Sequence, residues 1–368
     1  MRAERPKIVI SAVNLVEGGT LSILQDCLAY AAGHLSQRFQ IIVLVNQKSL
    51  FDFPQIDFIE FPHAKRSWLF RLYHEYWLFR GLSKKLNAEL WLSLHDMTPN
   101  IVAKRLAVYC HNPAPFYSLS LREAWLEPIF AMFNLFYRWA YWVNIHRNDF
   151  VIVQQKWMRR EFQSMFGIRN ILVAHPEVPE LPLSRIHLAK NKNLYRFIYP
   201  AFPRVFKNFE VICEASKKLL EYGVNNFEVI LTIDGTESRY AKSILKKYRS
   251  ITQLKFVGKQ SRKNIYDMYE SADCLIFPSK LETWGLPITE FKCMERPILA
   301  ADLEYAHETV GSYLHARFFD PNDPEELSKN MLSIIKRNFI PSQDQYSKPH
   351  QPYVQGWKEL FDFLLSQK

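Results

Sequence analysis

Short apolar runs alternate with longer segments of helical period along the first half of the chain, and few polar residues interrupt the short runs. The pattern predicts helices at Thr20–Leu35, Trp68–Leu86 and Glu123–Ile145. Between them it predicts seven strands, at Lys7–Ser11, Phe39–Val45, Phe58–Phe61, Leu90–Leu94, Leu106–Cys110, Phe150–Gln154 and Asn170–Ala174. Continuous rather than alternating hydrophobicity is typical of a parallel sheet that is covered on both faces.

A second series of the same kind follows a proline-containing, basic stretch at 181–193, which we interpret as a linker. Its predicted strands lie at Tyr195–Pro200, Phe227–Ile233, Leu254–Val257, Cys274–Pro278, Ile298–Ala300 and Ala316–Phe319. Two βαβα series predict two Rossmann-like, doubly wound α/β domains, 1–180 and 194–345, that face one another across a cleft. The last segment, 346–368, predicts an amphipathic helix at Tyr353–Leu365 that packs on either domain, the N-terminal one included.

Composition narrows the class of protein. The chain has 368 residues, of which 48% are apolar and 23% charged, as in a globular protein. Five scattered cysteines without metal-ligand spacing predict reduced thiols in a cytoplasmic protein, and the charged N-terminus leads into no long apolar segment typical of a signal peptide. The apolar stretch Trp125–Ile145 contains Glu127, Pro128 and Arg138, which argues against a membrane-spanning helix.

The stretch with the clearest chemistry begins at Ala272 and reads A-D-C-L-I-F-P-S-K-L-E-T-W-G-L-P-I-T-E-F. It predicts a strand, a loop carrying Glu282, and a helix whose first turn contains Pro287. Backbone N–H groups around Gly285 and Leu286 would form an anion site, and two glutamates eight residues apart suit sugar or ribose hydroxyls. An ordinary strand-loop-helix with a glutamate favouring the helix dipole remains the alternative.

The run P-S-x-x-E-x-x-G-L-P-x-x-E within this stretch resembles the signature of family 4 of the retaining glycosyltransferases, which have the GT-B fold. The resemblance is strongest from Tyr195 to Pro324. It implies that Glu290 binds the ribose of a nucleotide and that Glu282 contacts the transferred sugar. It also implies contacts of the sugar or diphosphate with the backbone of three residues, Trp284, Gly285 and Leu286.

A second candidate group follows the first strand of the C-terminal half, in Y-P-A-F-P-R-V-F-K-N. Arg204 and Lys207 would stabilise the charge of a leaving nucleoside diphosphate. The family usually has an arginine five residues before its lysine, where this chain has Phe202, so Lys207 matches the pattern better than Arg204. Solvated loop charges are the alternative.

The remaining candidates are glycines and polar residues at strand ends. Gly18, Gly19 and Thr20 form a loop that would close over the donor, and His111 would contact the transferred sugar. Asp96 is a candidate for the acceptor hydroxyls, and Gly258 for the nucleotide base, although a structural histidine and turn glycines are the alternatives.

Aromatic and basic residues concentrate in the first half of the chain. Segments 61–79 and 116–147 hold seven and ten aromatics, and the chain carries a net charge of +10. Basic helices flanked by tryptophan can lie in a bilayer interface, so 61–85 and 116–147 predict contact with an anionic membrane surface, with packing on the domain's own sheet as the alternative. No nucleic-acid-binding module is recognised.

Together these patterns predict a cytoplasmic, retaining glycosyltransferase, peripheral on the inner face of the cell membrane. It would transfer sugar from a nucleotide-sugar to a glycan or lipid-linked acceptor in surface polysaccharide synthesis. We expect no metal or other cofactor, because no D-x-D motif is present and cations can take the metal's place. The alternatives are a nucleotide-sugar epimerase or phosphorylase-like enzyme, or a non-catalytic membrane-associated protein that binds sugar nucleotides.

Overall fold

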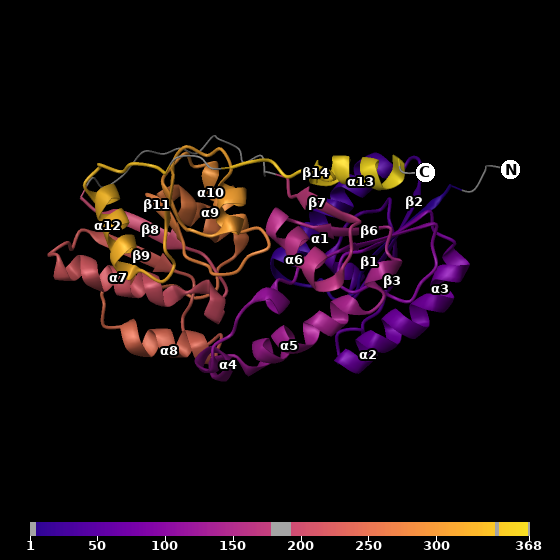
Figure 1. Ribbon diagram of the computed structural model, residues 1–368, viewed down its shortest axis with the longest axis horizontal. Helices are drawn as coiled ribbons and strands as arrows, with labels where there is room; N and C mark the ends of the chain where they lie inside the picture. The colour runs from indigo at the N-terminus through magenta and orange to yellow at the C-terminus, as the bar shows by residue number, and fades with distance from the viewer. Residues whose placement is uncertain (1–4, 178–192, 343–345, 367–368) are drawn as a thin grey trace. The chain divides into compact units, whose positions relative to one another are not determined.

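The computed structural model describes residues 5–177, 193–342 and 346–366, and the chain forms two compact units (Figure 1). The first consists of Met1–Phe116, Asn134–Glu177 and Pro349–Lys368, and the second of Tyr117–Phe133 and Val178–Lys348. The expected linker, 181–193, lies outside the described residues except for Asn193.

The first unit is built on an eight-stranded parallel sheet in the order β14-β7-β6-β5-β4-β1-β2-β3. The strands are β1 (Lys7–Ala12), β2 (Gln40–Val45), β3 (Asp57–Glu60), β4 (Leu90–Ser93), β5 (Arg105–Tyr109), β6 (Phe150–Val153), β7 (Ile171–His175) and β14 (Tyr353–Gln355). Its helices are α1 (Gly18–Tyr30), α2 (Trp68–Tyr73), α3 (Phe79–Leu86), most of α5 (Pro128–Trp142), α6 (Lys156–Phe166) and α13 (Gly356–Ser366).

Successive residues of β1 point to opposite faces of this sheet, and each face has its own apolar core. Ile8 and Ile10 pack in one core with residues of α1 and α13. Val9 packs in the other core with Phe79, the first residue of α3. Burial on both faces explains why these strands are apolar throughout.

The second unit has a six-stranded parallel sheet in the order β10-β9-β8-β11-β12-β13. Its strands are β8 (Tyr195–Tyr199), β9 (Phe227–Leu231), β10 (Leu254–Phe256), β11 (Cys274–Phe277), β12 (Ile298–Ala301) and β13 (Ala316–Phe319). Its helices are α4 (Leu121–Leu126), α7 (Phe209–Glu221), α8 (Arg239–Tyr248), α9 (Arg262–Ser271), α10 (Leu286–Lys292), α11 (Glu304–Val310) and α12 (Pro324–Ile335). The predicted α/β class with two Rossmann-like sheets is confirmed.

One predicted helix, Glu123–Ile145, is wrong as a single element. The chain forms α4 and α5, separated at Glu127, whose backbone has φ −133° and ψ 70°. Pro128 causes the break, because a residue that precedes proline is disfavoured in the helical conformation.

The same region also changes the domain boundary, which the sequence places at 180. Residues Tyr117–Phe133 belong to the second unit. The rings of Tyr117 and Phe130 contact Phe206, with centroids 6.1 and 5.1 Å away. These contacts explain why the α4 segment belongs with the residues that follow β8.

The end of the chain differs in part from the predicted helix Tyr353–Leu365. Tyr353–Gln355 form β14, a parallel edge strand paired with β7, and the helix α13 starts only at Gly356. The helix lies in the first unit, where it contacts α1 and β7 (Figure 1). Arg105 binds its C-terminal carbonyls, donating hydrogen bonds to Leu364 (3.1 Å) and Leu365 (2.9 Å).

None of the helices in the described part of the chain combines the length and the apolarity needed to cross a bilayer.

Replacing Phe361 with alanine should destabilise the first unit by about 3–5 kcal/mol, because the buried ring packs in the core shared with α1 and leaves a cavity there. Urea unfolding monitored by tryptophan fluorescence measures the loss. Lys358→Ala on the exposed face of the same helix is the control, with an expected change within about 0.5 kcal/mol. Equal stability of the two variants would show that α13 does not anchor the unit.

Candidate active site

The loop between β11 and α10 carries the sequence motif, and its shape depends on Gly285. This residue has φ +89°, and a Cβ atom there would lie 3.3 Å from Cε1 of Phe277. A side chain would therefore be strained and crowded at once, which explains glycine at this position. The helix begins at the next residue, with Pro287 in its first turn as predicted.

Glu282 in this loop forms an ion pair with Lys207, 75 residues earlier in the chain. The side chains are 13% and 18% exposed, so both charges are largely withdrawn from water. The Lys207 ammonium also lies 5.6 and 5.9 Å from the ring centroids of Phe206 and Phe277. The structure thus brings together the two residues for which sequence analysis expects the central roles.

Hydrogen bonds clamp the two loops that carry this pair. The hydroxyl of Tyr199, on β8, donates to the carbonyl of Lys207 at 2.9 Å. The backbone N–H of Lys280 donates to the carbonyl of Phe206 at 2.7 Å, and Tyr305 donates to the carbonyl of Ser279 at 2.6 Å. Lys207 is therefore held by its own backbone, and the loop that carries Glu282 is held by the backbone of Ser279 and Lys280.

The position of this pair follows from the strand order. β8 and β11 are neighbours, but the chain continues from β8 to β9 on one side and from β11 to β12 on the other. The loops after such a pair of strands diverge, and ligands of open α/β sheets bind in the crevice that this leaves.

Arg204 is not part of the Lys207–Glu282 pair. One guanidinium nitrogen lies 3.7 Å from a carboxylate oxygen of Glu127, at the break between α4 and α5. Burial raises the pKa of Glu127, and Arg204 acts against that shift. Sequence analysis missed Glu127 as a functional neighbour, although the Glu-Pro dipeptide marks the break that turns its side chain toward Arg204.

Glu290, on α10, is held by two tyrosines of α9 that sequence analysis also missed. The hydroxyls of Tyr266 and Tyr269 donate to its two carboxylate oxygens at 3.3 and 3.0 Å. Burial raises the pKa of Glu290, while these hydrogen bonds and the charge of Arg262 act in the opposite direction. The spacing of three residues, which places both tyrosines on one helix face, is the signal that could have found them.

Trp284 contributes only its backbone to the surface of the loop. Its indole is buried and donates to the Thr289 hydroxyl at 2.8 Å, and its carbonyl accepts a hydrogen bond from Thr309. Lys292 is half-buried and donates to the carbonyl of Thr309. These contacts link the motif loop to α11. Leu286, the third backbone candidate, is the first residue of α10.

Gly258 follows β10 and meets the loop after β9. A Cβ atom on this residue, which has φ +69°, would lie 2.7 Å from a carboxylate oxygen of Asp234. That carboxylate already accepts hydrogen bonds from the backbone and hydroxyl of Thr236. Close contact between the two loops therefore requires glycine at 258.

The first unit holds the other candidates, again after neighbouring strands. His111 is buried, its ring nitrogens included, and stacks on Tyr109 with ring centroids 4.4 Å apart. Burial lowers the pKa of His111 and so favours the neutral imidazole, whereas the negative charge of Asp96 acts in the opposite direction.

Asp96 holds the strand end that carries His111. Its carboxylate accepts hydrogen bonds from the backbone N–H groups of His111 and Asn112 and from the hydroxyls of Tyr137 and Tyr141. Four protein donors occupy the oxygens that sequence analysis assigns to an acceptor. The geometry accordingly favours a positioning role for Asp96.

Gly18, Gly19 and Thr20 form the first residues of α1, after β1. Gly18 has φ +68° with open space around its Cα, and both glycines are exposed. Thr20 donates from its hydroxyl to the carbonyl of Glu17 at 3.2 Å. The segment is open enough for a ligand to approach its backbone closely.

A buried polar network lies below the same edge of this sheet, and sequence analysis missed it. The Ser11 hydroxyl is 2.8 Å from Nε2 of His95, whose Nδ1 is 3.4 Å from a carboxylate oxygen of Glu75. Arg71 donates to the same oxygen at 2.9 Å. The order Ser-His-Glu matches a catalytic triad, but Ser11, His95 and Glu75 are fully buried, so no substrate can reach the hydroxyl. The network neutralises a buried carboxylate.

Within residues 5–177, 193–342 and 346–366, no cluster of three or more His, Cys, Asp and Glu side chains is arranged to hold a metal ion. The five cysteines are free thiols, and four of them are buried.

Comparisons with known proteins agree with this fold. Residues 183–350 match the family model described as "Glycosyl transferases group 1". No curated protein sequence matches the chain. Among solved structures, sucrose-phosphate synthase from Thermosynechococcus elongatus is 14% identical with a TM-score of 0.64, and the match covers 91% of this chain and 90% of that one.

Two further solved structures are similar over nearly the whole chain. WaaG, a glycosyltransferase involved in lipopolysaccharide biosynthesis, is 12% identical with a TM-score of 0.66, over 89% of this chain and 90% of its own. HepE of Anabaena, solved with UDP-glucose, is 17% identical with a TM-score of 0.61, over 90% of each chain. The fold is therefore that of the GT-B glycosyltransferases, and the match to the group 1 glycosyltransferase model lies in residues 183–350 of the chain.

Lys292 should make stability depend on pH, because burial lowers its pKa from 10.5 to about 8. Below pH 8 the lysine is protonated in both states. Between pH 8 and 10.5 the folded state binds fewer protons than the unfolded state, so stability rises with pH, by at most about 3 kcal/mol.

The difference in unfolding free energy between the native sequence and Lys292→Met, measured by urea unfolding from pH 7 to 10.5, isolates this contribution from other titrating groups. Lys263→Met, at an exposed position of α9, is the control and should leave the pH profile unchanged. A pH-independent difference for Lys292→Met would contradict the lowered pKa.

Proposed function

We propose that this protein is a retaining glycosyltransferase that moves a sugar from a nucleotide-sugar donor to a hydroxyl of a glycan or lipid-linked acceptor. The observation that carries the proposal is the Lys207–Glu282 pair on the two diverging loops after β8 and β11. The family match over 183–350 supports it, and so does the similarity to HepE, which was solved in complex with UDP-glucose.

Donor binding is assigned to the second unit. Glu290 would accept hydrogen bonds from the ribose hydroxyls, held in place by Tyr266 and Tyr269. The Gly258 loop would face the base. Backbone N–H groups of Trp284, Gly285 and Leu286 would meet the sugar or the diphosphate.

Charge stabilisation is the role proposed for the two cations. As the bond between the anomeric carbon and the phosphate oxygen breaks, the nucleoside diphosphate leaves with the electron pair and gains negative charge. The ammonium of Lys207 stabilises that charge, with the guanidinium of Arg204 as a second cation. Because Lys207 is largely buried, its field is weakly screened by water.

Retention follows if the acceptor hydroxyl attacks from the face that the diphosphate leaves. The anomeric carbon then passes through an oxocarbenium-like state, and the acceptor proton goes to an oxygen of the departing phosphate. Glu282 would contact the transferred sugar beside the anomeric carbon and would hold Lys207 in place before the donor binds.

Acceptor binding is assigned to the first unit. The neutral imidazole of His111 can donate one hydrogen bond and accept another. Because both ring nitrogens are buried, contact with the hydroxyls of the transferred sugar would require the strand end that carries His111 to open. Gly18, Gly19 and Thr20 would approach the donor through their backbone.

A membrane-facing role is proposed for the aromatic segments. Trp77, Trp125 and Trp139 are 77%, 70% and 64% exposed, which is unusual for side chains of this size. Such residues suit the interface of an anionic bilayer, and basic neighbours such as Lys84 and Lys85 add electrostatic attraction. We therefore propose a cytoplasmic enzyme that binds the inner face of the cell membrane and acts in surface polysaccharide synthesis. The similarity to WaaG, which is involved in lipopolysaccharide biosynthesis, supports this role.

The first test is transfer itself. Thermal stabilisation by UDP-, GDP- and dTDP-sugars should identify the donor, and transfer from it should fall about 10²- to 10³-fold in Lys207→Met, because a cation that stabilises the leaving group is lost. Glu282→Gln should lose activity similarly. Lys242→Met, at an exposed position of α8, is the charge-matched control and should keep full activity.

Unchanged turnover in Lys207→Met or Glu282→Gln, with native melting temperatures, would overturn the assignment. The anomeric configuration of the product, read by NMR, must equal that of the donor. Release of nucleotide or epimerised sugar without any acceptor would favour the epimerase or phosphorylase-like enzyme, and donor binding without turnover would favour the non-catalytic protein.

Metal dependence is tested separately. We expect transfer to persist in EDTA, because Lys207 and Arg204 would supply the positive charge that a divalent ion supplies elsewhere. Loss of activity in EDTA that Mn²⁺ or Mg²⁺ restores would contradict metal independence.

A further inference from the structure

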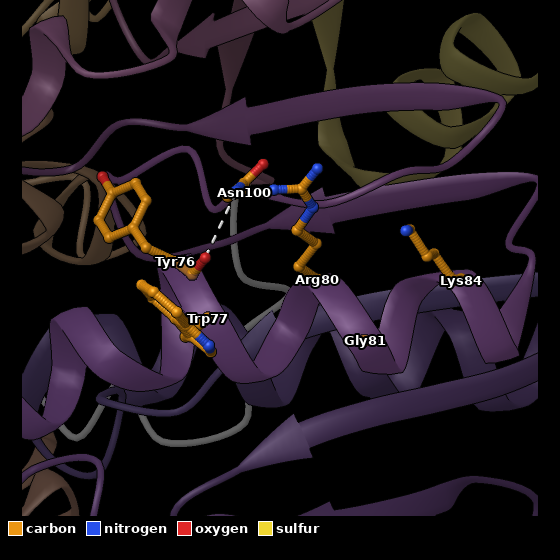
Figure 2. A pocket seen from close by; sticks show the side chains of 6 residues that line it. All are labelled: Tyr76, Trp77, Arg80, Gly81, Lys84 and Asn100. Carbon is orange, nitrogen blue, oxygen red and sulfur yellow. Dashed lines mark hydrogen bonds between the residues drawn. The ribbon is translucent and has the colours of Figure 1, made fainter.

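A pocket of about 530 Å³ opens on the first unit, over η3 (His74–Leu78) and α3. It is lined by Tyr76, Trp77, Arg80, Gly81, Lys84 and Asn100 (Figure 2). None of these residues has a role in the reaction proposed above. We name it the Arg80–Lys84 pocket.

Two cations of this pocket lie on the same side of one helix. Arg80 and Lys84 are four residues apart on α3, and Figure 2 shows both side chains extending to the same side. Like charges at this spacing destabilise a helix, and a bound anion would offset this effect.

Neither cation is neutralised by the described part of the protein. Arg80 and Lys84 have no ion-pair partner among these residues. By contrast, Lys65 pairs with Glu17 at 3.2 Å and Arg71 with Glu75 at 2.9 Å. Cations of this segment that have an acid within reach use it, so the two in the pocket are available to an external anion.

Asn100 provides a fixed polar wall. Its side chain donates to the carbonyl of Tyr76 at 3.4 Å and accepts a hydrogen bond from Arg147 at 2.9 Å. Arg147 does not line the pocket, but it holds Asn100 in place from behind. The two cations that line the cavity, Arg80 and Lys84, suit a group with several anionic oxygens, such as a phosphate.

The surroundings of the pocket are apolar and exposed. Leu69, Tyr73 and Trp77, on α2 and η3, are 78%, 54% and 77% exposed. Glu75 is the only acidic residue in segment 61–85, and it is fully buried. The outer surface of this segment therefore combines exposed aromatic groups with the positive charges of Arg80 and Lys84.

We propose that the Arg80–Lys84 pocket binds the phosphate of an anionic lipid headgroup while Trp77 and its neighbours enter the bilayer interface. The guanidinium and the ammonium hold the phosphate oxygens, and the volume admits a glycerophosphate group. Exposed aromatic side chains beside the pocket favour a lipid over a soluble phosphate ester. This inference rests on the proposed contact with an anionic membrane.

The test is binding of the full-length protein to phosphatidylcholine vesicles with and without phosphatidic acid. Any basic residue near such a surface contributes about 1 kcal/mol, equal to about a fivefold change in affinity. Lys84→Gln and Arg80→Gln should each weaken binding to vesicles that contain phosphatidic acid by at least about tenfold, which is more than this general effect. Lys85→Gln is the matched control, because Lys85 is exposed on the same helix and does not line the pocket, and it should cost about fivefold or less.

The outcomes separate the pocket from the proposed function. Equal losses in Lys84→Gln and Lys85→Gln overturn the pocket and leave membrane binding intact, whereas no vesicle binding by the native protein overturns both. Glycerol 3-phosphate that displaces the protein from vesicles at micromolar concentration would instead assign the pocket to a soluble ester. Reversible dimerisation that Trp77→Ser abolishes would assign the surface to a second copy. In each variant, stabilisation by the nucleotide-sugar should be unchanged, which confirms that the donor site is intact.

Discussion

Each of the two sheets has one point at which the strand order reverses, and the candidate residues of each unit depend on that point for their position. In the first unit the reversal lies between β1 and β4, and in the second between β8 and β11. Loops that leave such neighbouring strands diverge to opposite faces of the sheet, so side chains at the strand ends are not covered by the next crossover. Gly18 follows β1 and Asp96 follows β4, while Lys207 and Glu282 follow β8 and β11. Residues far apart in sequence meet because the topology leaves this edge open.

Carboxylates gathered at these edges differ in role because their surroundings differ. Glu282 is neutralised by Lys207, the cation that we propose stabilises the leaving phosphate. Glu290 is held by two tyrosine hydroxyls, and we propose that ribose hydroxyls add to them. Asp96 and Glu75 are occupied by protein donors, and Glu75 is fully buried as well. Access to solvent and the nature of the partner, rather than the residue type, therefore separate candidate catalytic acids from structural ones.

The sheets are predictable because burial on both faces leaves a local signal, and the predicted strands Leu90–Leu94 and Cys274–Pro278 agree with the observed ones to within a residue. The Lys207–Glu282 pair is predictable because a motif fixes each member relative to its strand end. Contacts that arise only in three dimensions are not predictable in this way. No local sequence pattern around Glu75 predicts that His95 and Ser11 lie nearby. Strand β14 is too short to be distinguished, from sequence, from the start of the helix that follows it.

The two units differ in how much their sequence reveals about what they bind. In the second unit, the proposed donor chemistry needs charges and backbone groups at fixed distances, and those requirements give a motif such as E-x7-E. In the first unit, the proposed binding depends on exposed aromatic area and unpaired positive charge, which many arrangements of residues supply. Trp77 and Lys84 line one pocket because η3 and the helix that follows it place them there, and no fixed spacing defines such a surface. For this reason the acceptor side is better identified by measuring what the surface binds than by a motif.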